Sequence, residues 1–386
     1  MRILLAADTF PPDVNGAANF ADRLARGLAA RGHDVHVLCP AESATPGTAA
    51  DGVLTVHRVK SRRTPFHPTF RFSTPRQAAR VAGPLLDRLR PDVVHVQSHF
   101  PVGRSVVWAA IERAVPVIAT NHFMPENLLG FVPAPPRVRS WAAAAAWRDL
   151  VRVYHQATVV TAPTPRAVDL LADQGFLGNA RAISCGIDLA HYATRRTVGG
   201  TGITVLFVGR LDREKNVGEL LRAVAAVPAA RAEIVGDGSC RKALTDEAER
   251  LGVTGRVRFR GFVGDDDLLQ AYRDADVFCM PGTAELQSLA TMEAMAAGLP
   301  VVAADAMALP HLVRSGVTGF LYPPGDVEQL AAALRWLAGN GITRAVMGRA
   351  GRQAVARHDL AGTLDAFEDV YREAARLPAA RPLLAS

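Results

Sequence analysis

The sequence predicts an α/β protein built from two doubly wound parallel-sheet domains, and three observations support this. A chain of 386 residues is longer than one hydrophobic core usually serves. Short, continuously apolar runs alternate with helix-length segments, which is typical of parallel strands covered on both faces. The alternation begins at Arg2 and begins again at Ile203. We therefore expect two Rossmann-like domains facing a central cleft, with ligands at the carboxyl ends of the strands.

The elements follow in order along the chain. Strands are expected at 2–7, 34–39, 92–97, 116–120 and 157–163 in the first half, and at 203–209, 232–236, 256–261, 275–280 and 299–304 in the second. A helix after the first strand is indicated by Phe20, Leu24 and Leu28, which recur every four residues. Two further helices are expected at 327–337 and 360–376. We place the domains at 1–188 and 189–365, followed by a C-terminal helix and tail at 366–386.

The composition is that of an ordinary globular protein, with 49% hydrophobic and 21% charged residues. No run approaches the roughly 18 apolar residues of a membrane span, and Asp8 comes too early for a signal peptide. The expected location is the cytoplasm. The four cysteines lie far apart without C-x-x-C spacing, so neither a zinc site nor a disulfide framework is predicted.

The formal net charge of +7 belongs entirely to the first half of the chain. Residues 1–190 carry 21 Lys and Arg against 14 Asp and Glu, whereas the remainder carries 23 of each. The basic residues gather in two groups with Trp141 and Trp147 among them: Arg58, Lys60, Arg62, Arg63, Arg71, Arg76 and Arg80, then Arg137, Arg139, Arg148 and Arg152. Such a face suits an anionic membrane or ligand. A solvated surface in an arginine-rich protein explains it equally well.

The segment VLFVGRLDREKN is the first candidate for chemistry. Gly209 ends a predicted strand, and Arg210 and Lys215 follow in the next loop. An arginine fork and a lysine point charge together suit a diphosphate, and they would neutralise the charge on a departing nucleotide diphosphate. The alternative is a surface charge pair between Lys215 and Asp212 or Glu214.

The second candidate is the pair Glu285 and Glu293, eight residues apart. We expect a helix to begin directly after Glu285, so that the backbone N–H groups of Leu286, Gln287 and Ser288 offer an anion site. Glu293 then lies on one helix face, where it is suited to accept hydrogen bonds from ribose hydroxyls, while Glu285 contacts the sugar. A carboxylate on an otherwise apolar helix is costly to bury unpaired, which favours a ligand role over a core role.

Two further segments lie at predicted strand ends in the first half. Asn15 and Gly16 open the first long helix, where glycine allows close approach to a phosphate; a plain turn with an N-cap is the alternative. His122 follows the 116–120 strand, a position where a histidine can bind a sugar hydroxyl or transfer a proton. Contacts to the acceptor are assigned to His99, Glu126 and Asn127.

Two patterns in the second half are set aside. Asp265-x-Asp267 resembles a metal–diphosphate motif, but it opens a helix and is better explained as helix-capping acids, so no metal site is assigned. Gly236-Asp237-Gly238 follows a strand but lacks the third glycine of a dinucleotide fingerprint, which argues against NAD.

Taken in order, these segments resemble glycosyltransferase family 4, whose fold is GT-B. The likeness rests on PPDVNG, RGHDVHVL, GRLDREKN, GDG, the two glutamates and SGVTGFLYPPGD, and it spans nearly the whole chain. It implies that Arg210 and Lys215 bind the donor diphosphate, and that Gly16 contacts phosphate through its backbone. It implies that Glu293 binds the ribose, Glu285 the transferred sugar, and that His122 lies near the reacting centre. The remaining donor contacts are assigned to Asn15, Gly209, Gly236, Asp237, Gly238, Phe262, Val263, Leu286, Gln287 and Ser288.

The resemblance also implies a reaction. The enzyme would be a retaining, metal-independent hexosyltransferase without a cofactor, using a nucleotide diphosphate sugar, UDP-linked by expectation, with the leaving phosphate as base. The C-terminal helix would cross back onto the first domain. Many members carry E-G-F-G or E-x-x-G where this chain has Glu285-Leu-Gln-Ser288, which leaves the donor sugar open.

Segments VHVQSHFPVGR, TNHFMPEN and AELQSLATMEAM look most similar to the diacylglycerol glucosyltransferase-like branch. The expected partners are therefore the nucleotide-sugar donor, a hydroxyl acceptor such as diacylglycerol or a small molecule, and an anionic membrane at its inner face, with no nucleic acid. An epimerase or hydrolase on the same fold, and a non-catalytic nucleotide-sugar or membrane-binding protein, remain as alternatives.

Overall fold

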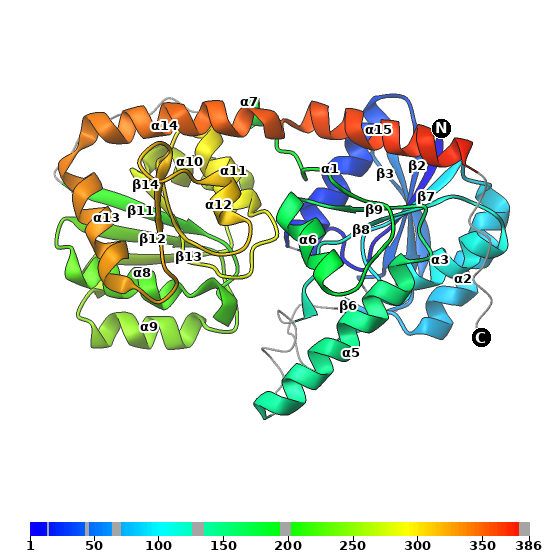
Figure 1. The fold of residues 1–386 in the computed structure, drawn as a ribbon, viewed down its shortest axis with the longest axis horizontal. Helices are drawn as coiled ribbons and strands as arrows, with labels where there is room; N and C mark the ends of the chain where they lie inside the picture. The colour runs from blue at the N-terminus through cyan, green and yellow to red at the C-terminus, as the bar shows by residue number, and fades with distance from the viewer. Residues whose placement is uncertain (14, 43–45, 64–70, 126–134, 194–201, 378–386) are drawn as a thin grey trace. The chain divides into compact units, whose positions relative to one another are not determined.

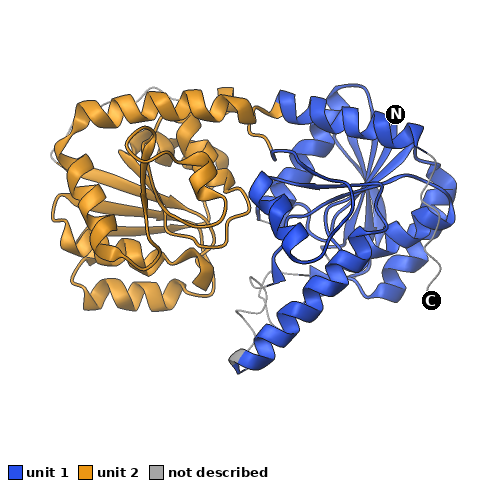
Figure 2. Cartoon of the chain, viewed as in Figure 1, with its two compact units in different colours: residues 1–185, 361–386 blue, residues 186–360 orange. Residues whose placement is uncertain are grey.

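The computed structural model describes residues 1–377 except 14, 43–45, 64–70, 126–134 and 194–201. The chain forms two compact units (Figure 2). Unit 1 comprises Met1–Cys185 together with the C-terminal segment from Ala361, and unit 2 comprises Gly186–Leu360. The chain thus crosses between the units after Cys185 and after Leu360, a few residues from the boundaries expected after 188 and 365.

Unit 1 contains an eight-stranded sheet in the order β10-β9-β8-β7-β1-β2-β4-β3 (Figure 1). Its strands are β1 Arg2–Ala6, β2 Asp34–Pro40, β3 Gly47–Asp51, β4 Leu54–Val59, β7 Val93–Val96, β8 Val117–Thr120, β9 Val159–Ala162 and β10 Ala180–Ala182. All pairings are parallel except that of β3 with β4. β5 Arg62–Arg63 and β6 Arg71–Phe72 form a separate antiparallel pair. The exposed edge strand β3 was not expected, because GTAAD has no apolar run.

The helices of unit 1 follow its strands. They are α1 Gly16–Ala30, α2 Pro75–Leu89, α3 Pro101–Glu112, α5 Pro136–Tyr154 and α6 Pro165–Asp173, with α15 Leu360–Arg376 at the end of the chain. Asn15 caps α1 by accepting a hydrogen bond from Ala18 N at 2.9 Å. In α1 the predicted Phe20, Leu24 and Leu28 are all buried, so the four-residue spacing marks the face that packs on the sheet.

Unit 2 contains a six-stranded, wholly parallel sheet in the order β13-β12-β11-β14-β15-β16. Its strands are β11 Ile203–Val208, β12 Ala230–Val235, β13 Val257–Gly261, β14 Val277–Met280, β15 Val301–Ala304 and β16 Gly319–Tyr322. Its helices are α7 Leu189–Tyr192, α8 Val217–Ala226, α9 Arg241–Arg250, α10 Asp265–Asp274, α11 Leu289–Ala296, α12 Leu309–Leu312, α13 Val327–Gly339 and α14 Gly341–Val355. The strand order reverses between β11 and β14, where ligands of doubly wound sheets bind. Two doubly wound units confirm the predicted fold class.

The last helix, α15, is built into unit 1. Tyr371 Oη lies 2.7 Å from Nδ1 of His95, a buried histidine of β7, and Arg181 of β10 forms a bidentate pair with Glu373 at 2.6 Å. Side chains of α15 also pack against α1, where a Cβ added to Gly27 would lie 2.7 Å from a methyl carbon of Leu364.

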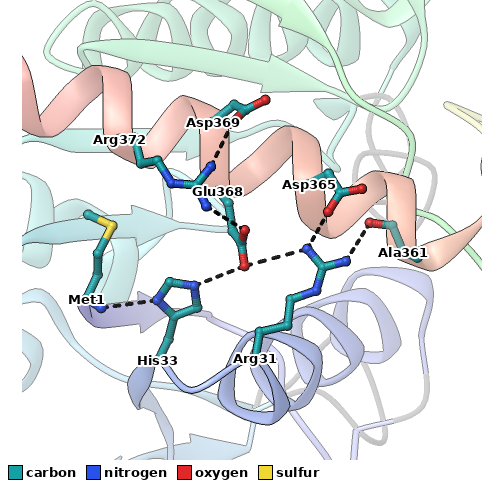
Figure 3. A network of polar contacts seen from close by, with 8 residues as sticks. All are labelled: Met1, Arg31, His33, Ala361, Asp365, Glu368, Asp369 and Arg372. Carbon is teal, nitrogen blue, oxygen red and sulfur yellow. Dashed lines mark hydrogen bonds and ion pairs between the residues drawn. The ribbon is translucent and has the colours of Figure 1, made fainter.

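A polar network joins the other side of α15 to the start of the chain (Figure 3). His33 lies between the Met1 amino group and Glu368, with Nδ1 at 3.2 Å from the former and Nε2 at 3.0 Å from the latter. Arg31 adds contacts of 2.7 Å to Asp365 and 2.9 Å to the Ala361 carbonyl. The packing and the network together make α15 an integral part of unit 1. Among the described residues no helix is long and apolar enough to cross a membrane.

Candidate functional site

In unit 2 the predicted donor residues gather at the carboxyl ends of four neighbouring strands. Gly209 and Arg210 follow β11, Gly236, Asp237 and Gly238 follow β12, and Phe262 and Val263 follow β13; Glu285 lies in the loop after β14. Because these strands are parallel neighbours, the loops that follow them meet at one edge of the sheet. Phe262 is 59% exposed there. The sequence thus identified the segments that the fold brings together.

The loops after β11 and β12 are held to each other. Leu211 N donates to the Asp237 carbonyl at 3.0 Å, and buried Asp212 accepts from the backbone and hydroxyl of Ser239 at 3.1 and 2.8 Å. A Cβ at Gly238 would lie 2.7 Å from the Leu211 backbone, and one at Gly236 would lie 2.0 Å from the Gly209 carbonyl. The close packing of the two loops therefore requires glycine at both positions.

Lys215 and Glu285 form an ion pair through Nζ and Oε1, although 70 positions separate them in the sequence. The loop geometry brings them together: Asn216 adopts a left-handed backbone with φ of 49° and donates to Pro281 O and Thr283 Oγ1, both at 3.3 Å. Thr283 N in turn donates to the Glu214 carbonyl at 3.0 Å. The ion-pair partner of Lys215 is thus Glu285, and not Asp212 or Glu214.

Arg210, and not Lys215, forms the ion pairs with Asp212 and Glu214. Its Nη1 lies 2.7 Å from Asp212 Oδ2, and its Nη2 lies 3.1 Å from Glu214 Oε1. Burial raises the pKa of Glu214 above its ordinary value. Both candidate cations are therefore held by carboxylates, and an anionic ligand would have to exchange with Asp212, Glu214 and Glu285.

The segment after Glu285 differs from the prediction. Helix α11 begins only at Leu289, so Leu286, Gln287 and Ser288 lie in the loop before it and the expected helix start was wrong. Ser288 has a left-handed backbone with φ of 71°, a strained conformation for a residue other than glycine, and its Oγ lies 2.8 Å from Thr291 Oγ1. No sequence pattern indicates this left-handed turn, since serine is an ordinary residue type at a helix N-cap.

Glu293 lies within α11, as expected, and is buried. Tyr272 Oη of α10 donates to Glu293 Oε2 at 3.0 Å, and the fully buried tyrosine ring packs edge-on against Tyr192 with centroids 5.7 Å apart. Tyr272 therefore fixes the carboxylate orientation. Sequence reasoning missed it, because a tyrosine within an amphipathic helix carries no distinguishing pattern. Asp265, Asp266 and Asp267 form the first turn of α10, so the predicted helix is confirmed, but its N-cap is Gly264 and no side chain makes a capping hydrogen bond.

In unit 1 a second set of polar residues lies at the ends of β1, β7 and β8. His122 follows β8; its Nε2 lies 3.0 Å from Gln97 Oε1, and its Nδ1 lies 4.0 Å from Cys185 Sγ. Its ring contacts Phe20 of α1 at 4.8 Å between centroids. Burial lowers the pKa of His122 to about 4, so the imidazole is neutral at physiological pH.

His99, a predicted acceptor contact, is buried against Phe100 with centroids 4.4 Å apart, and burial lowers its pKa to about 4. Its Nδ1 has no hydrogen-bond partner within the described part of the chain. Gly16 is the exposed first residue of α1, and Asn15 acts as its N-cap. Glu126 and Asn127 lie outside the described residues.

Asp8 organises this end of unit 1 and was not predicted as a site residue. It is half-buried two residues after β1 and accepts from Ser98 Oγ at 2.5 Å, Val102 N at 3.0 Å and Gly103 N at 3.1 Å. It thereby caps α3, whose own N-cap Phe100 makes no side-chain bond. Burial raises the pKa of Asp8. The available signal was a carboxylate immediately after a buried strand.

The basic groups of unit 1 divide into structural and exposed residues. Arg58 donates to Pro11 O at 2.9 Å, and Arg71 donates to Ser61 Oγ at 2.8 Å, so both serve the local fold. The exposed cations are Lys60, Arg62, Arg63, Arg76, Arg80, Arg137, Arg148 and Arg152. On α5 Trp141 is 69% exposed, whereas Trp147 is buried. In Figure 1 the N-terminal half of α5 extends beyond the sheet of its unit.

All four cysteines are free thiols. Within the described ranges no group of three or more His, Cys, Asp or Glu side chains is arranged to hold a metal ion.

Two family models match the chain. Residues 14–191 match "Glycosyltransferase Family 4", and residues 195–354 match "Glycosyl transferases group 1". Among solved structures, sucrose-phosphate synthase from Thermosynechococcus elongatus is 20% identical with a TM-score of 0.80, covering 96% of this chain and 98% of that one. HepE of Anabaena in complex with UDP-glucose is 21% identical with a TM-score of 0.76, covering 97% and 100%. These likenesses show the fold.

Three curated relatives are similar in sequence. The GDP-mannose-dependent alpha-mannosyltransferase of Mycobacterium tuberculosis is 31% identical, with 85% of each chain covered. The alpha-monoglucosyldiacylglycerol synthase of Streptococcus pneumoniae is 28% identical over 83% of this chain and 75% of that one. The sulfoquinovosyl transferase SQD2 of Arabidopsis thaliana is 32% identical over 70% of this chain, which spans only about half of that protein's length (54%). With this coverage and the fold above, the chain belongs to glycosyltransferase family 4 and has the GT-B fold.

Proposed function

We propose that this glycosyltransferase is a retaining, metal-independent enzyme that moves a hexose from a UDP-sugar to a hydroxyl acceptor. The Lys215–Glu285 pair is the observation that carries the proposal, because a cation suited to a phosphate lies beside a carboxylate suited to sugar hydroxyls in the loops at the carboxyl edge of the unit 2 sheet. Arg210 and Lys215 would exchange their carboxylates for the donor diphosphate, which releases Glu285 to the hexose hydroxyls. Glu293, oriented by Tyr272, would bind the ribose.

The reaction that fits these residues needs no protein carboxylate as nucleophile. The acceptor oxygen attacks the anomeric carbon on the face from which the diphosphate leaves, so the configuration is retained. The bond from that carbon to the diphosphate breaks, and the acceptor proton passes to a leaving phosphate oxygen. Arg210 and Lys215 stabilise the charge that develops on the diphosphate, without a metal ion.

The acceptor proposed is a lipid hydroxyl such as that of diacylglycerol. Support comes from the exposed cations of unit 1 and from Trp141 on α5, which suit an anionic membrane surface. The name of one relative points the same way, since it is an alpha-monoglucosyldiacylglycerol synthase. A GDP-mannose-dependent relative makes GDP-mannose the main competitor as donor.

A thermal-shift screen against UDP-, GDP-, ADP- and TDP-sugars tests the donor. A ligand at about 100 times its Kd stabilises the native state by about 2.7 kcal/mol, so a UDP-sugar should raise the apparent melting temperature clearly. A shift confined to GDP-mannose would reassign the donor. No shift with any sugar nucleotide would contradict the donor site.

Turnover then tests the reaction. We expect product only when diacylglycerol in anionic vesicles is added, at the same rate with EDTA as with Mg²⁺, and with the anomeric proton coupling of the donor retained. Donor consumption without an acceptor would favour the hydrolase or epimerase alternative. Binding without any turnover would favour the non-catalytic one.

A further inference from the structure

The environment of His122 in unit 1 restricts both its orientation and its proton. Its Nε2 lies 3.0 Å from Gln97 Oε1, and the ring packs against Phe20, which also contacts Phe367 of α15 with centroids 5.8 Å apart. These contacts hold the imidazole from two directions. On the third side, Nδ1 lies 4.0 Å from the Cys185 sulfur, the one polar contact of this atom within the described residues.

The hydrogen-bond roles follow from the chemistry of the partners. An amide oxygen only accepts, so the contact to Gln97 Oε1 requires the proton of the neutral ring on Nε2. Burial raises the pKa of the Cys185 thiol to about 12, so this group remains S–H and is a weak donor toward the Nδ1 lone pair. Both neighbours therefore favour the same tautomer.

Hydrogen bonding at this strand end is incomplete. Gln97 Nε2 and Asn121 Nδ2 are both buried, and neither has a hydrogen-bond partner within the described residues. Asn121 directly precedes His122, and Gln97 follows β7, the strand beside β8. Buried amide N–H groups without partners are costly, which indicates oxygen atoms of a ligand at this place.

We propose that Gln97 is a positioning residue, which holds neutral His122 with its proton on Nε2 and its Nδ1 lone pair available to a substrate hydroxyl. The unused N–H groups of Gln97 and Asn121 then donate to oxygens of the same substrate. This inference rests on the proposed function, since the hydroxyl is that of a transferred hexose or its acceptor. A substrate hydroxyl displaces only the weak Cys185 contact.

The tautomer can be measured without turnover. Long-range ¹H–¹⁵N spectra of protein labelled with ¹⁵N-histidine distinguish the two tautomers, and His122→Gln identifies the signal. We expect His122 to be neutral at pH 7 with its proton on Nε2. A proton on Nδ1 would overturn the assignment.

Gln97→Glu tests the role in the reaction. A carboxylate at Nε2 favours the imidazolium and should raise the pKa of His122 by about one to three. If the Nδ1 lone pair is used, the acid limb of the pH profile of kcat moves up by the same amount and activity returns at alkaline pH. A limb that stays in place while the pKa moves would refute the role. Gln77→Glu is the matched control, because it adds the same charge to the capping box of α2. It should change neither the pKa of His122 nor the acid limb of the pH profile of kcat.

Gln97→Met provides a second variant that adds no buried charge. It removes the amide at similar volume and should lower kcat by about 10- to 100-fold, because the ring loses its orientation. The affinity for UDP, measured by calorimetry, should not change; an unchanged kcat would contradict the proposal. If the wild type consumes neither UDP-glucose nor GDP-mannose, the proposed function fails, and the tautomer and pKa measurements still decide whether Gln97 holds the ring.

Discussion

At the scale of single residues, substitution of Lys215 tests whether the Lys215–Glu285 pair serves catalysis or only stabilises the fold. Lys215→Ala should reduce transfer by at least about 100-fold, because it removes a cation that balances charge on the leaving diphosphate. The change in melting temperature should be small by comparison. Product formation and thermal stability measured on the same samples check this, and an equal loss of both would contradict the catalytic assignment.

Two variants control this experiment. Lys242→Ala removes an exposed lysine paired with Asp246 on α9. It should affect neither the rate of sugar transfer nor the melting temperature. The double variant Lys215→Met/Glu285→Gln removes both charges, so it should recover the stability lost through an unpaired carboxylate but not the activity.

The residue types at the site could be predicted from the sequence, but their contacts could not. Arg210 and Lys215 are predicted because cations follow an apolar strand, and Glu285 and Glu293 because their spacing puts two carboxylates beside an apolar helix. The pairing of Lys215 with Glu285 depends on the left-handed backbone of Asn216, which no local pattern encodes. Gln97 and Tyr272 were missed for the same reason, since each acts on a partner that is distant in the sequence.

Among the elements, α3 is closely constrained by a backbone contact at its third residue. A Cβ at Gly103 would lie 2.1 Å from the Ser98 carbonyl oxygen, and Gly103 N donates to Asp8. Gly103→Ala should therefore destabilise the protein by about 1–3 kcal/mol, although alanine is the better helix former by about 1 kcal/mol. Urea unfolding measures the difference.

Gly362→Ala is the matched control within another helix. Apart from its chain neighbours and the nearby backbone of α15, no atom of the described residues lies within 4 Å of a Cβ added at Gly362, so only the helix propensity changes and stability should rise slightly. Equal effects of the two substitutions would show that the contact between α3 and the end of β7 does not limit stability.

Elements were predictable where apolar runs were continuous. Ten strands of the two sheets and the helices α1, α13 and α15 follow from such runs or from four-residue spacing, whereas β10 and β16 were not predicted. The expected helix directly after Glu285 failed because the chain first passes through a left-handed turn at Ser288. β3 and β4 were overlooked because polar residues interrupt them, and their pairing supplies the stabilisation instead.

For the whole molecule, buried histidines predict a loss of stability in acid. Burial lowers the pKa of His57, His99 and His122 to about 4 and that of His95 to about 3, against an ordinary value of 6.5. Below pH 6.5 the unfolded chain binds protons that the folded chain does not. The free energy of unfolding should therefore fall between pH 6.5 and 4, by at most about 1.4 kcal/mol per pH unit for each such histidine.

Urea midpoints at pH 7.5, 5.5 and 4.5 measure this slope. His57→Gln should make it shallower, because one of the groups is removed while a hydrogen-bonding side chain remains beside His36 and Thr48. Burial raises the pKa of Asp8, so Asp8 adds stability as the pH falls, which is opposite to the effect of the histidines. Because Asp8 is present in the wild type and in His57→Gln alike, it does not alter the comparison of their slopes. Identical slopes would show that protonation of His57 is not coupled to unfolding.

The double crossing of the chain also sets an order of events during synthesis. Unit 1 begins with Met1, yet its sheet receives Tyr371 and Glu373, and its N-terminal amino group joins a network completed by Glu368. While the ribosome is still making unit 2, unit 1 has Phe20 and His95 without the helix that covers them. The first unit to be made is thus the last to be finished, and a nascent chain stalled before Leu360 would carry an uncovered apolar surface for a chaperone to recognise.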